Sequence, residues 1–332
     1  MEWVRGKTIG HGSFAAVSLA KPINQNSQFP SLIAVKTCGV SHSDSLSKEG
    51  QVLQQLKDCP EIINCYGDLM TIENNEKLYN LALEYASGGA LSDKVKSLRL
   101  SENEVRKYTC SILKGVDSIH RNGFVHCDIK LDNILLVNED GMENAKIADF
   151  GLAKKANLIS TMYEVRGTPI YMAPETVRGG EQEAASDIWA VGCLVTEMIT
   201  GNPVWNCSDF SALVMKIGVG SEIPEIPAKL SEDGKDFLEK CFVKNPRGRW
   251  TAEMLLDHPF VKDISFEKEV ANQISPRDVF DFPDWESAES TCLTLPEFEL
   301  PMIAPATRLG QLLTDQKQLN WSSVSNSWVK VR

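Results

Sequence analysis

The sequence at 126–133 reads His126-Cys127-Asp128-Ile129-Lys130-Leu131-Asp132-Asn133, and Asp149-Phe150-Gly151 begins 21 residues after Asp128. An aspartate in a loop is usually a turn former, because its side chain bonds to nearby backbone groups. Here a lysine and an asparagine stand close to Asp128 and a second aspartate follows on another loop, which argues against that simple interpretation. Two carboxylates and an amide on two loops can position a reactant and neutralise charge.

Further short motifs stand on both sides of this stretch: Gly10-His11-Gly12, Ile33-Ala34-Val35-Lys36 and Ala173-Pro174-Glu175. Each is weak by itself, but in this order and at these spacings the set resembles a eukaryotic protein kinase. The resemblance covers about residues 3–261. It implies an α+β bilobal kinase fold, with a β-rich N-lobe over about 3–83 that carries one regulatory helix, and a mainly helical C-lobe over about 87–261.

The resemblance implies a role for each polar residue of these two loops. Asp128 would accept or orient the proton of the attacking hydroxyl, and Lys130 would neutralise the transferred phosphoryl group. Asn133 and Asp149 would each bind one Mg²⁺ ion at the phosphates of ATP. A lysine at position 130 is typical of Ser/Thr kinases, whereas tyrosine kinases carry a different pattern there. The expected ligands are therefore ATP and Mg²⁺.

The glycines at 10 and 12 would let backbone amides approach phosphate oxygens. Alone they would favour an ordinary hairpin turn, and Ala15 stands where the kinase pattern has its third glycine. Together with the hinge between the lobes, where the backbone would bond to adenine, the resemblance assigns ATP binding to Ile9, Gly10, Gly12, Val17, Ala34, Lys36, Glu49, Glu84 and Ala86.

Lys36 ends an apolar, strand-like run, and a lysine there is costly unless it is paired. Glu49 follows 13 residues later, on an expected helix over Ser45–Leu56 whose buried face carries Val52, Leu53 and Leu56. In the kinase pattern this lysine holds the α- and β-phosphates and pairs with a glutamate on the helix, so the resemblance implies a Lys36–Glu49 ion pair. The alternative is that Glu49 is a solvated helix charge.

Three further residues have structural roles in the kinase pattern: Glu175 would pair with Arg249, and Asp187 would brace the catalytic loop. Thr168 lies in the segment that faces the substrate, where it would contact Asp128. Ser160 and Thr161 are the candidate phosphorylation sites of the loop between Asp149 and Glu175.

Cys127 departs from the pattern, because most kinases carry an arginine before the catalytic aspartate. That arginine normally pairs with a phosphate on the activation loop, and a cysteine cannot. Two hypotheses follow: activity depends less on loop phosphorylation than usual, and Cys127 is sensitive to oxidation. For the second, a quiet buried thiol is the favoured alternative.

The segment Gly167–Glu175 looks like the signature of MAP kinase kinase kinases and the STE group. The opening Trp3–Lys7, the cysteine at 127 and the short acidic tail resemble plant MEKK-type MAP kinase kinase kinases. The implied substrate is a MAP kinase kinase, phosphorylated on Ser/Thr of its activation loop in stress or abscisic acid signalling, with an upstream kinase or phosphatase as a further partner. Two alternatives stay open: a Ser/Thr kinase of another STE-like branch, and a nucleotide-binding pseudokinase scaffold.

The bulk composition narrows the remaining classes. A formal net charge of −11 argues against a nucleic-acid binder or an anionic-membrane binder, because both need clustered Lys and Arg. The 9 cysteines are odd in number and include no C-x-x-C pair, which favours free thiols in a reducing compartment. No run of 18 apolar residues occurs, so no membrane span is expected. The strand-like start at Trp3 leaves no room for a signal peptide, and the expected location is cytoplasm, nucleus or both.

Residues 262–332 differ in composition from the rest of the chain. From Asp278 to Thr307 there is no Lys or Arg, and prolines interrupt any long helix. We expect a largely disordered, acidic tail. Its aromatic residues favour a regulatory or docking role over a simple linker.

Overall fold

The structure is a computed structural model, and it describes residues 2–12, 15–23, 30–139, 141–157, 165–207, 209–220 and 222–262, together with the backbone of a strand at 329–331. The expected tail over 262–332 therefore lies almost wholly outside the described residues. So do Ser160 and Thr161, the candidate phosphorylation sites.

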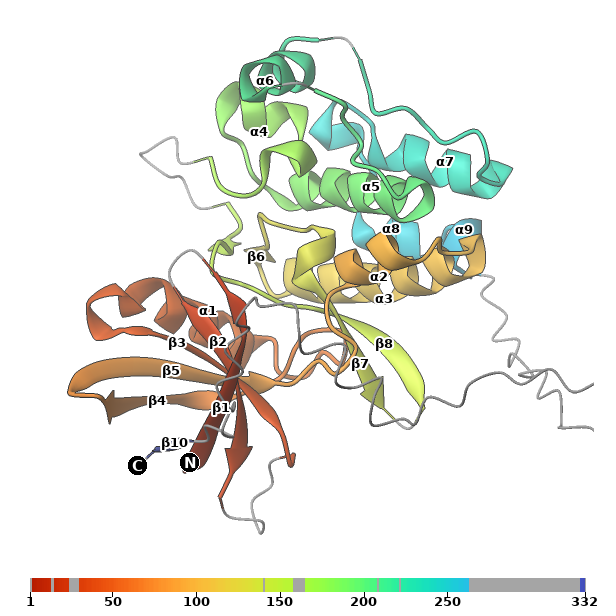
Figure 1. The fold of residues 1–332 in the computed structure, drawn as a ribbon. Helices are drawn as coiled ribbons and strands as arrows, with labels where there is room; N and C mark the ends of the chain where they lie inside the picture. The colour runs from red at the N-terminus through yellow and green to blue at the C-terminus, as the bar shows by residue number, and fades with distance from the viewer. Residues whose placement is uncertain are drawn as a thin grey trace, which may run out of the picture. The chain divides into compact units, whose positions relative to one another are not determined.

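The N-terminal part is an antiparallel sheet with strand order β10-β1-β2-β3-β5-β4 and one helix beside it (Figure 1). Its elements are β1 (Trp3–His11), β2 (Ala16–Pro22), β3 (Ile33–Gly39), η1 (Val40–His42), α1 (Ser43–Gln55), β4 (Cys65–Glu73), β5 (Glu76–Glu84) and β10 (Val329–Val331). The expected helix over Ser45–Leu56 begins two residues earlier, and Leu56 is its C-cap. Such differences of one or two residues are normal at helix ends.

Side chains of the sheet alternate between two faces, as the pleat of a strand requires. In β3, Ile33 and Val35 join a small cluster with Trp3, whereas Ala34 joins the large core that contains α1. Arg5 in β1 donates to Glu73 at the end of β4 (Nη2 to Oε1, 2.8 Å). This bond joins β4, at one end of the pairing order, to β1, the second strand from the other end, so the sheet curls and brings β1 and β4 within side-chain reach.

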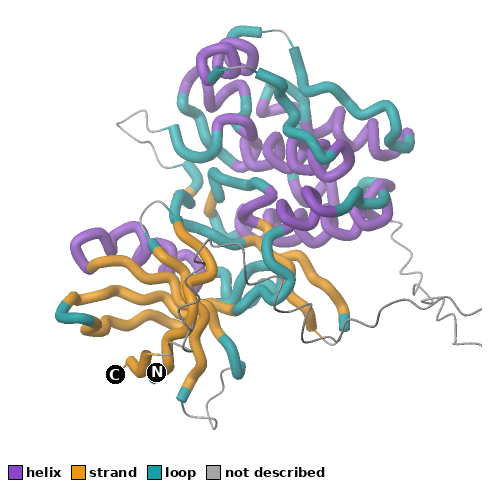
Figure 2. The backbone as a smooth tube through the Cα atoms, in the orientation of Figure 1, coloured by secondary structure: helices purple, strands orange, loops and turns teal. Residues whose placement is uncertain are grey.

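The C-terminal part is mainly helical (Figure 2). Its helices are α2 (Leu91–Ser97), α3 (Glu102–Arg121), α4 (Pro174–Gly179), α5 (Ala184–Thr200), α6 (Phe210–Gly218), α7 (Glu232–Cys241), α8 (Ala252–Leu256) and α9 (Pro259–Lys262), with short 3-10 turns η2 (Leu131–Asn133), η3 (Pro169–Tyr171) and η4 (Pro246–Gly248). Two small two-stranded antiparallel sheets accompany them: β6 (Phe124–Val125) pairs with β9 (Lys154–Lys155), and β7 (Ile134–Glu139) forms a hairpin with β8 (Met142–Ile147).

Two helices at the centre of this part show why the chain folds here. In α3, a capping box of Ser101 and Glu104 satisfies the first turn, and a buried stripe includes Val105, Ile112 and Val116. The neighbouring α5 is buried along most of its length, so it needs apolar residues on nearly every side. Within the described residues, no helix combines the length and apolar character that crossing a bilayer requires. The α+β bilobal fold expected from the sequence is confirmed.

Candidate active site

One buried carboxylate on α5 holds the loop at 126–133 in place by accepting two of its backbone N–H groups. Asp187 accepts the backbone N–H of His126 at Oδ2 (2.9 Å) and that of Cys127 at Oδ1 (3.0 Å). Its Oδ2 also lies 2.9 Å from Nε2 of His120. Burial alone would raise the pKa of Asp187, but His120 and these donors outweigh it and hold the pKa below its ordinary value. The ionised carboxylate supports Cys127, whose φ of 68° is unusual for a residue other than glycine.

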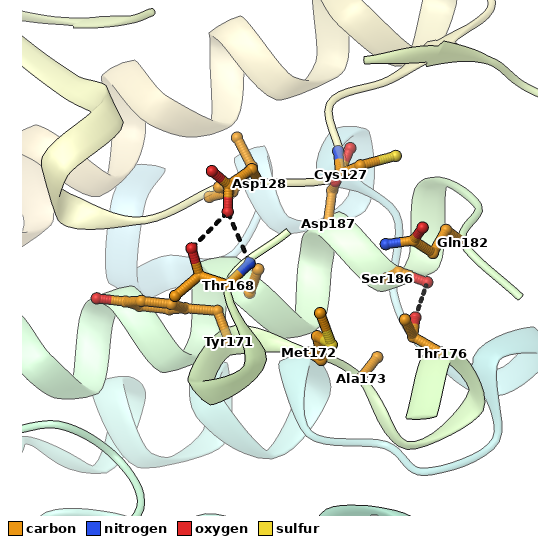
Figure 3. Close-up of a pocket in the computed structure, with 12 residues that line it drawn as sticks. Cys127, Asp128, Thr168, Tyr171, Met172, Ala173, Thr176, Gln182, Ser186 and Asp187 are labelled. Carbon is orange, nitrogen blue, oxygen red and sulfur yellow. Dashed lines mark hydrogen bonds between the residues drawn. The ribbon is translucent and has the colours of Figure 1, made fainter. Parts of the chain in front are cut away.

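Asp128 is the convergence point of the loop. Thr168 donates to its Oδ1 twice, from the backbone N–H (2.9 Å) and from the hydroxyl (2.8 Å), as Figure 3 shows. Its Oδ2 lies 2.8 Å from Nζ of Lys130 and accepts the side-chain amide of Asn133 (3.1 Å). The expected contact between Thr168 and Asp128 is thus present, and Lys130 completes it by donating to the Thr168 hydroxyl (2.9 Å).

The approach of Thr168 depends on the residue before it. Gly167 has a φ of +103°, and a Cβ there would lie 2.2 Å from the carbonyl oxygen of Cys127. Only glycine fits this conformation and this contact. The Gly-Thr pair at 167–168 therefore holds the later segment against the catalytic loop.

Asp149 stands on a second strained position, with a φ of 62°. The next residue, Phe150, is buried and meets the ring of His126 edge-on, with centroids 4.8 Å apart. Oδ1 of Asp149 lies 2.9 Å from Nζ of Lys36. Burial opposes ionisation of Asp149, but Lys36 outweighs it and lowers the pKa of the carboxyl below its ordinary value.

Lys36 and Glu49 form the ion pair that the sequence predicts, with Nζ 2.7 Å from Oε2. Burial alone would lower the pKa of Lys36, but Glu49 and Asp149 outweigh it and raise the pKa above its ordinary value. Burial also raises the pKa of Glu49, against the opposing effect of Lys36. With the ammonium in direct contact we take the pair as ionised. The alternative of a solvated Glu49 fails, since its side chain is 2% exposed.

Asn133 and Asp149 fit a magnesium site by the chemistry of their donors. The side-chain nitrogen of Asn133 is engaged by Asp128, which leaves the amide oxygen to bind a cation. Among the described residues, no group of three or more His, Cys, Asp or Glu side chains could hold a metal. Mg²⁺ is usually held by one or two protein oxygens together with substrate phosphates and water, so an amide oxygen and a carboxylate are suitable ligands.

The glycines at 10 and 12 have no role that the fold itself explains. Neither has a positive φ, and an added Cβ would stay at ordinary distances of 3.8 Å from Val17 and 3.5 Å from Ala15. Gly12 closes the loop by donating to the Ala15 carbonyl (2.7 Å). Bare backbone at both positions therefore fits close approach by a ligand such as phosphate.

Residues 3–261 match the family described as protein kinase domain. The chain belongs to the protein kinase family. It is 47% identical to mitogen-activated protein kinase kinase kinase 20 of Arabidopsis thaliana, over 100% of both chains. It is also 41% identical to mitogen-activated protein kinase kinase kinase 17 of the same plant, over 87% of this chain and 78% of that protein. It is 36% identical to mitogen-activated protein kinase kinase kinase 3 of Homo sapiens, over 79% of this chain and 42% of that protein.

The remaining nucleotide-side residues come from the kinase sheet and the hinge. Ile9 and Val17 lie on β1 and β2, and Ala34 pairs with Leu83 across β3 and β5. At the hinge, the N–H of Glu84 donates to the carbonyl of Asn64 (2.8 Å). The contact of adenine with the backbone of Glu84 and Ala86 stays a prediction, and for Glu84 it would have to use the carbonyl group.

The sequence missed a second role for Glu84. Its buried carboxylate lies 2.8 Å from Nζ of Lys146 and accepts the N–H and side-chain amide of Asn64, both at 3.0 Å. Lys146 is 5% exposed, on β8 of the kinase C-lobe. The signal in the sequence was a lysine between apolar residues, in Ala145-Lys146-Ile147, because a buried lysine needs a partner.

Glu175 and Arg249 form the expected structural pair of the kinase. Nη1 and Nη2 of Arg249 meet Oε1 and Oε2 of Glu175 at 2.7 and 3.1 Å, and the arginine side chain is 0% exposed. Such a bidentate pair is directional as well as strong. It fastens α4, which follows the substrate-facing segment, to the lower part of the C-lobe.

Cys127 is a quiet thiol in this structure. Burial raises its pKa to about 12, and the charge of Asp187 adds to the effect. The thiolate is the reactive form, so such a thiol is slow to oxidise. The Cys127 side chain is half-buried, and its raised pKa favours a quiet thiol over an oxidation-sensitive one.

Proposed function

We propose that this protein kinase transfers the γ-phosphoryl group of ATP to serine or threonine in the activation loop of MAP kinase kinases. The observation that carries phosphoryl transfer is the continuous chain of contacts from Glu49 through Lys36 to Asp149, with Asp128 oriented by Thr168. The names of the relatives support the substrate class. The protein would then act at the first tier of a MAP kinase cascade.

In the proposed mechanism, Lys36 binds the α- and β-phosphates, and Glu49 keeps its ammonium in place. Asp128 orients the attacking hydroxyl and takes its proton at the carboxylate. Lys130, which contacts both Asp128 and Thr168, offsets the charge of the transferred group. Asn133 and Asp149 would hold Mg²⁺, which supplies charge neutralisation at the phosphates.

Two alternatives remain distinguishable. A pseudokinase scaffold gains no support from the geometry, since Lys36, Asp128, Asn133 and Asp149 all stand in bonded, mutually consistent positions. A kinase of another STE-like branch differs only in its substrate. Stress or abscisic acid signalling, a cytoplasmic or nuclear location, an upstream kinase or phosphatase and a regulatory tail are further parts of the proposal.

The test is Mg²⁺-ATP phosphorylation of a panel of catalytically dead MAP kinase kinases by the purified full chain, with Asp128→Asn as the control. We expect labelling of activation-loop Ser/Thr, reduced about 100-fold or more in the control because the base is lost. Autophosphorylation without transfer to the panel would favour another branch. ATP binding without any transfer would favour the scaffold.

A further inference from the structure

Two carboxylates stand at the start of α5, and each holds a different part of the active site. Asp187 fastens the backbone of the catalytic loop, as described above. Glu183, one helical turn earlier, binds the segment that follows Asp149. Its Oε1 lies 3.0 Å from Nζ of Lys154, and its Oε2 accepts the backbone N–H of Asn157 (3.1 Å).

The two segments that these carboxylates hold are themselves paired. Lys154 and Lys155 form β9, which pairs with Val125 and Phe124 of β6. β6 leads directly into the loop that carries Asp128, and β9 follows soon after Asp149. The start of α5 therefore contacts β9 through Glu183 and, through Asp187, the two residues that directly follow β6.

Glu183 is well placed to act as a rigid anchor. Its N–H donates to the hydroxyl of Ser186 (3.4 Å), and its carbonyl accepts the N–H of Ser186 (2.7 Å). That hydroxyl also reaches Glu175 (3.3 Å), the partner of Arg249. Figure 3 shows Ser186 and Asp187 lining one pocket with Cys127.

The neighbouring residue holds the far end of the same segment. Gln182 is buried, accepts the N–H of Arg166 (3.1 Å), and donates to the carbonyl of Arg166 (2.6 Å). The turn before α5 thus contacts the chain at Asn157 and again at Arg166. The charges of Lys154, Arg166 and Glu183 all act on the Cys127 thiol, so these groups gather around a residue that is itself neutral.

We propose that Glu183 is a positioning residue for phosphoryl transfer: its carboxylate clamps the segment after Asp149 onto α5 and thereby keeps Asp149 and Asp128 in register. The inference rests on the kinase activity and not on the identity of the protein substrate. The Glu183 side chain is 44% exposed and that of Lys154 18% exposed, so solvent weakens the electrostatic attraction between them. We therefore expect the pair to act mainly by holding the segment in place, with a moderate effect on kcat.

The test compares Glu183→Gln with Glu181→Gln, which changes an exposed acid on the same turn whose carbonyl, not its side chain, makes the contacts to Thr176 and Ser186. Phosphorylation of myelin basic protein, a generic substrate, gives kcat and the KM for ATP. Hydrogen exchange compares the exchange rate of the Asn157 backbone amide, which Glu183 holds, with the rates of the His126 and Cys127 amides, which Asp187 holds. Lys154→Gln and the double variant with Glu183→Gln complete a cycle.

We expect Glu183→Gln to lower kcat by roughly threefold to tenfold, as loss of a partly exposed clamp should. The KM for ATP should stay nearly constant. The Asn157 amide should exchange faster while the amides of His126 and Cys127 stay protected by Asp187. The double variant should be no worse than the poorer single variant, because both singles break one interaction.

A wild-type kcat in Glu183→Gln would overturn the clamp, and so would an equal loss of kcat in Glu181→Gln and Glu183→Gln. An unchanged exchange rate of the Asn157 amide in Glu183→Gln would overturn it as well. A fall in kcat accompanied by faster exchange throughout the C-lobe would assign Glu183 a general structural role and also overturn it. A wild-type chain without kinase activity would count against the function, and the exchange measurement would still decide the contact.

Discussion

Thr168 donates both its backbone N–H and its hydroxyl to the same oxygen of Asp128, at 2.9 and 2.8 Å. The other oxygen of Asp128 meets Lys130 and Asn133. The orientation of the base therefore depends on a residue that lies 40 positions away in the chain. If Asp128 is the base, as proposed, catalysis would require that the segment around Gly167 be docked.

Replacing Thr168 tests this dependence. Thr168→Ala removes the hydroxyl but keeps the backbone bond, and a hydrogen bond to a charged group contributes about 1.5–3 kcal/mol. We expect kcat to fall roughly 10- to 100-fold with little change in the KM for ATP. Thr168→Ser keeps the hydroxyl and should retain most of the activity. Equal losses in the two variants would show that the methyl group, not the bond to Asp128, is what matters.

The buried Asp187 gives a pH dependence with a definite sign. Its folded pKa lies below the ordinary 3.8, so its contribution to stability is fully present above pH 3.8 and is lost as pH falls through the folded value. We expect Asp187→Asn to be less stable at pH 6 by about 3 kcal/mol. The difference in the free energy of unfolding between the wild type and Asp187→Asn should narrow below pH 3.8. Urea unfolding of both proteins at pH 6 and at several pH values below 3.8 measures it, and a difference that stays constant below pH 3.8 would contradict the assignment.

Long-range contacts could be predicted from the sequence where each partner stands in a recognisable local pattern. The face of α1 marked by Val52 and Leu53 identifies Glu49 as the buried acid, and a buried acid needs the cation that Lys36 supplies. The resemblance also placed Asp187 under the catalytic loop and Thr168 at Asp128, because those residues occupy fixed places in short motifs. In each case the partner is itself part of a motif.

Other contacts could not be read from local pattern. Glu84 was assigned only through its backbone, yet its carboxylate pairs with Lys146, which is 62 positions away on another hairpin. The contact between Glu183 and Lys154 joins two charged residues that look like ordinary surface positions. Such pairs arise when tertiary packing brings separate elements together, and neither periodicity nor capping residues specify them.

The Cys127 thiol should react slowly with electrophiles. Burial raises its pKa from 9.0 to about 12, so its thiolate fraction near neutral pH falls about 1,000-fold. We expect iodoacetamide at pH 7.5 to label Cys127 at least that much more slowly in the native kinase than in urea, as read by mass spectrometry. Peroxide should inactivate the wild type and Cys127→Ser at the same rate. Protection of activity in Cys127→Ser would restore the oxidation-sensitive interpretation.

The bidentate pair of Arg249 and Glu175 should resist even a conservative change. The guanidinium is fully buried and also donates to the carbonyl of Ala185 (2.5 Å), and a lysine cannot reproduce this planar set of donors. We expect Arg249→Lys to lower the free energy of unfolding by about 3 kcal/mol in urea. Arg121 is 62% exposed and pairs with Glu253 at the surface, so Arg121→Lys should change it by less than about 1 kcal/mol. Similar losses in the two variants would mean that burial of the guanidinium adds nothing beyond its charge.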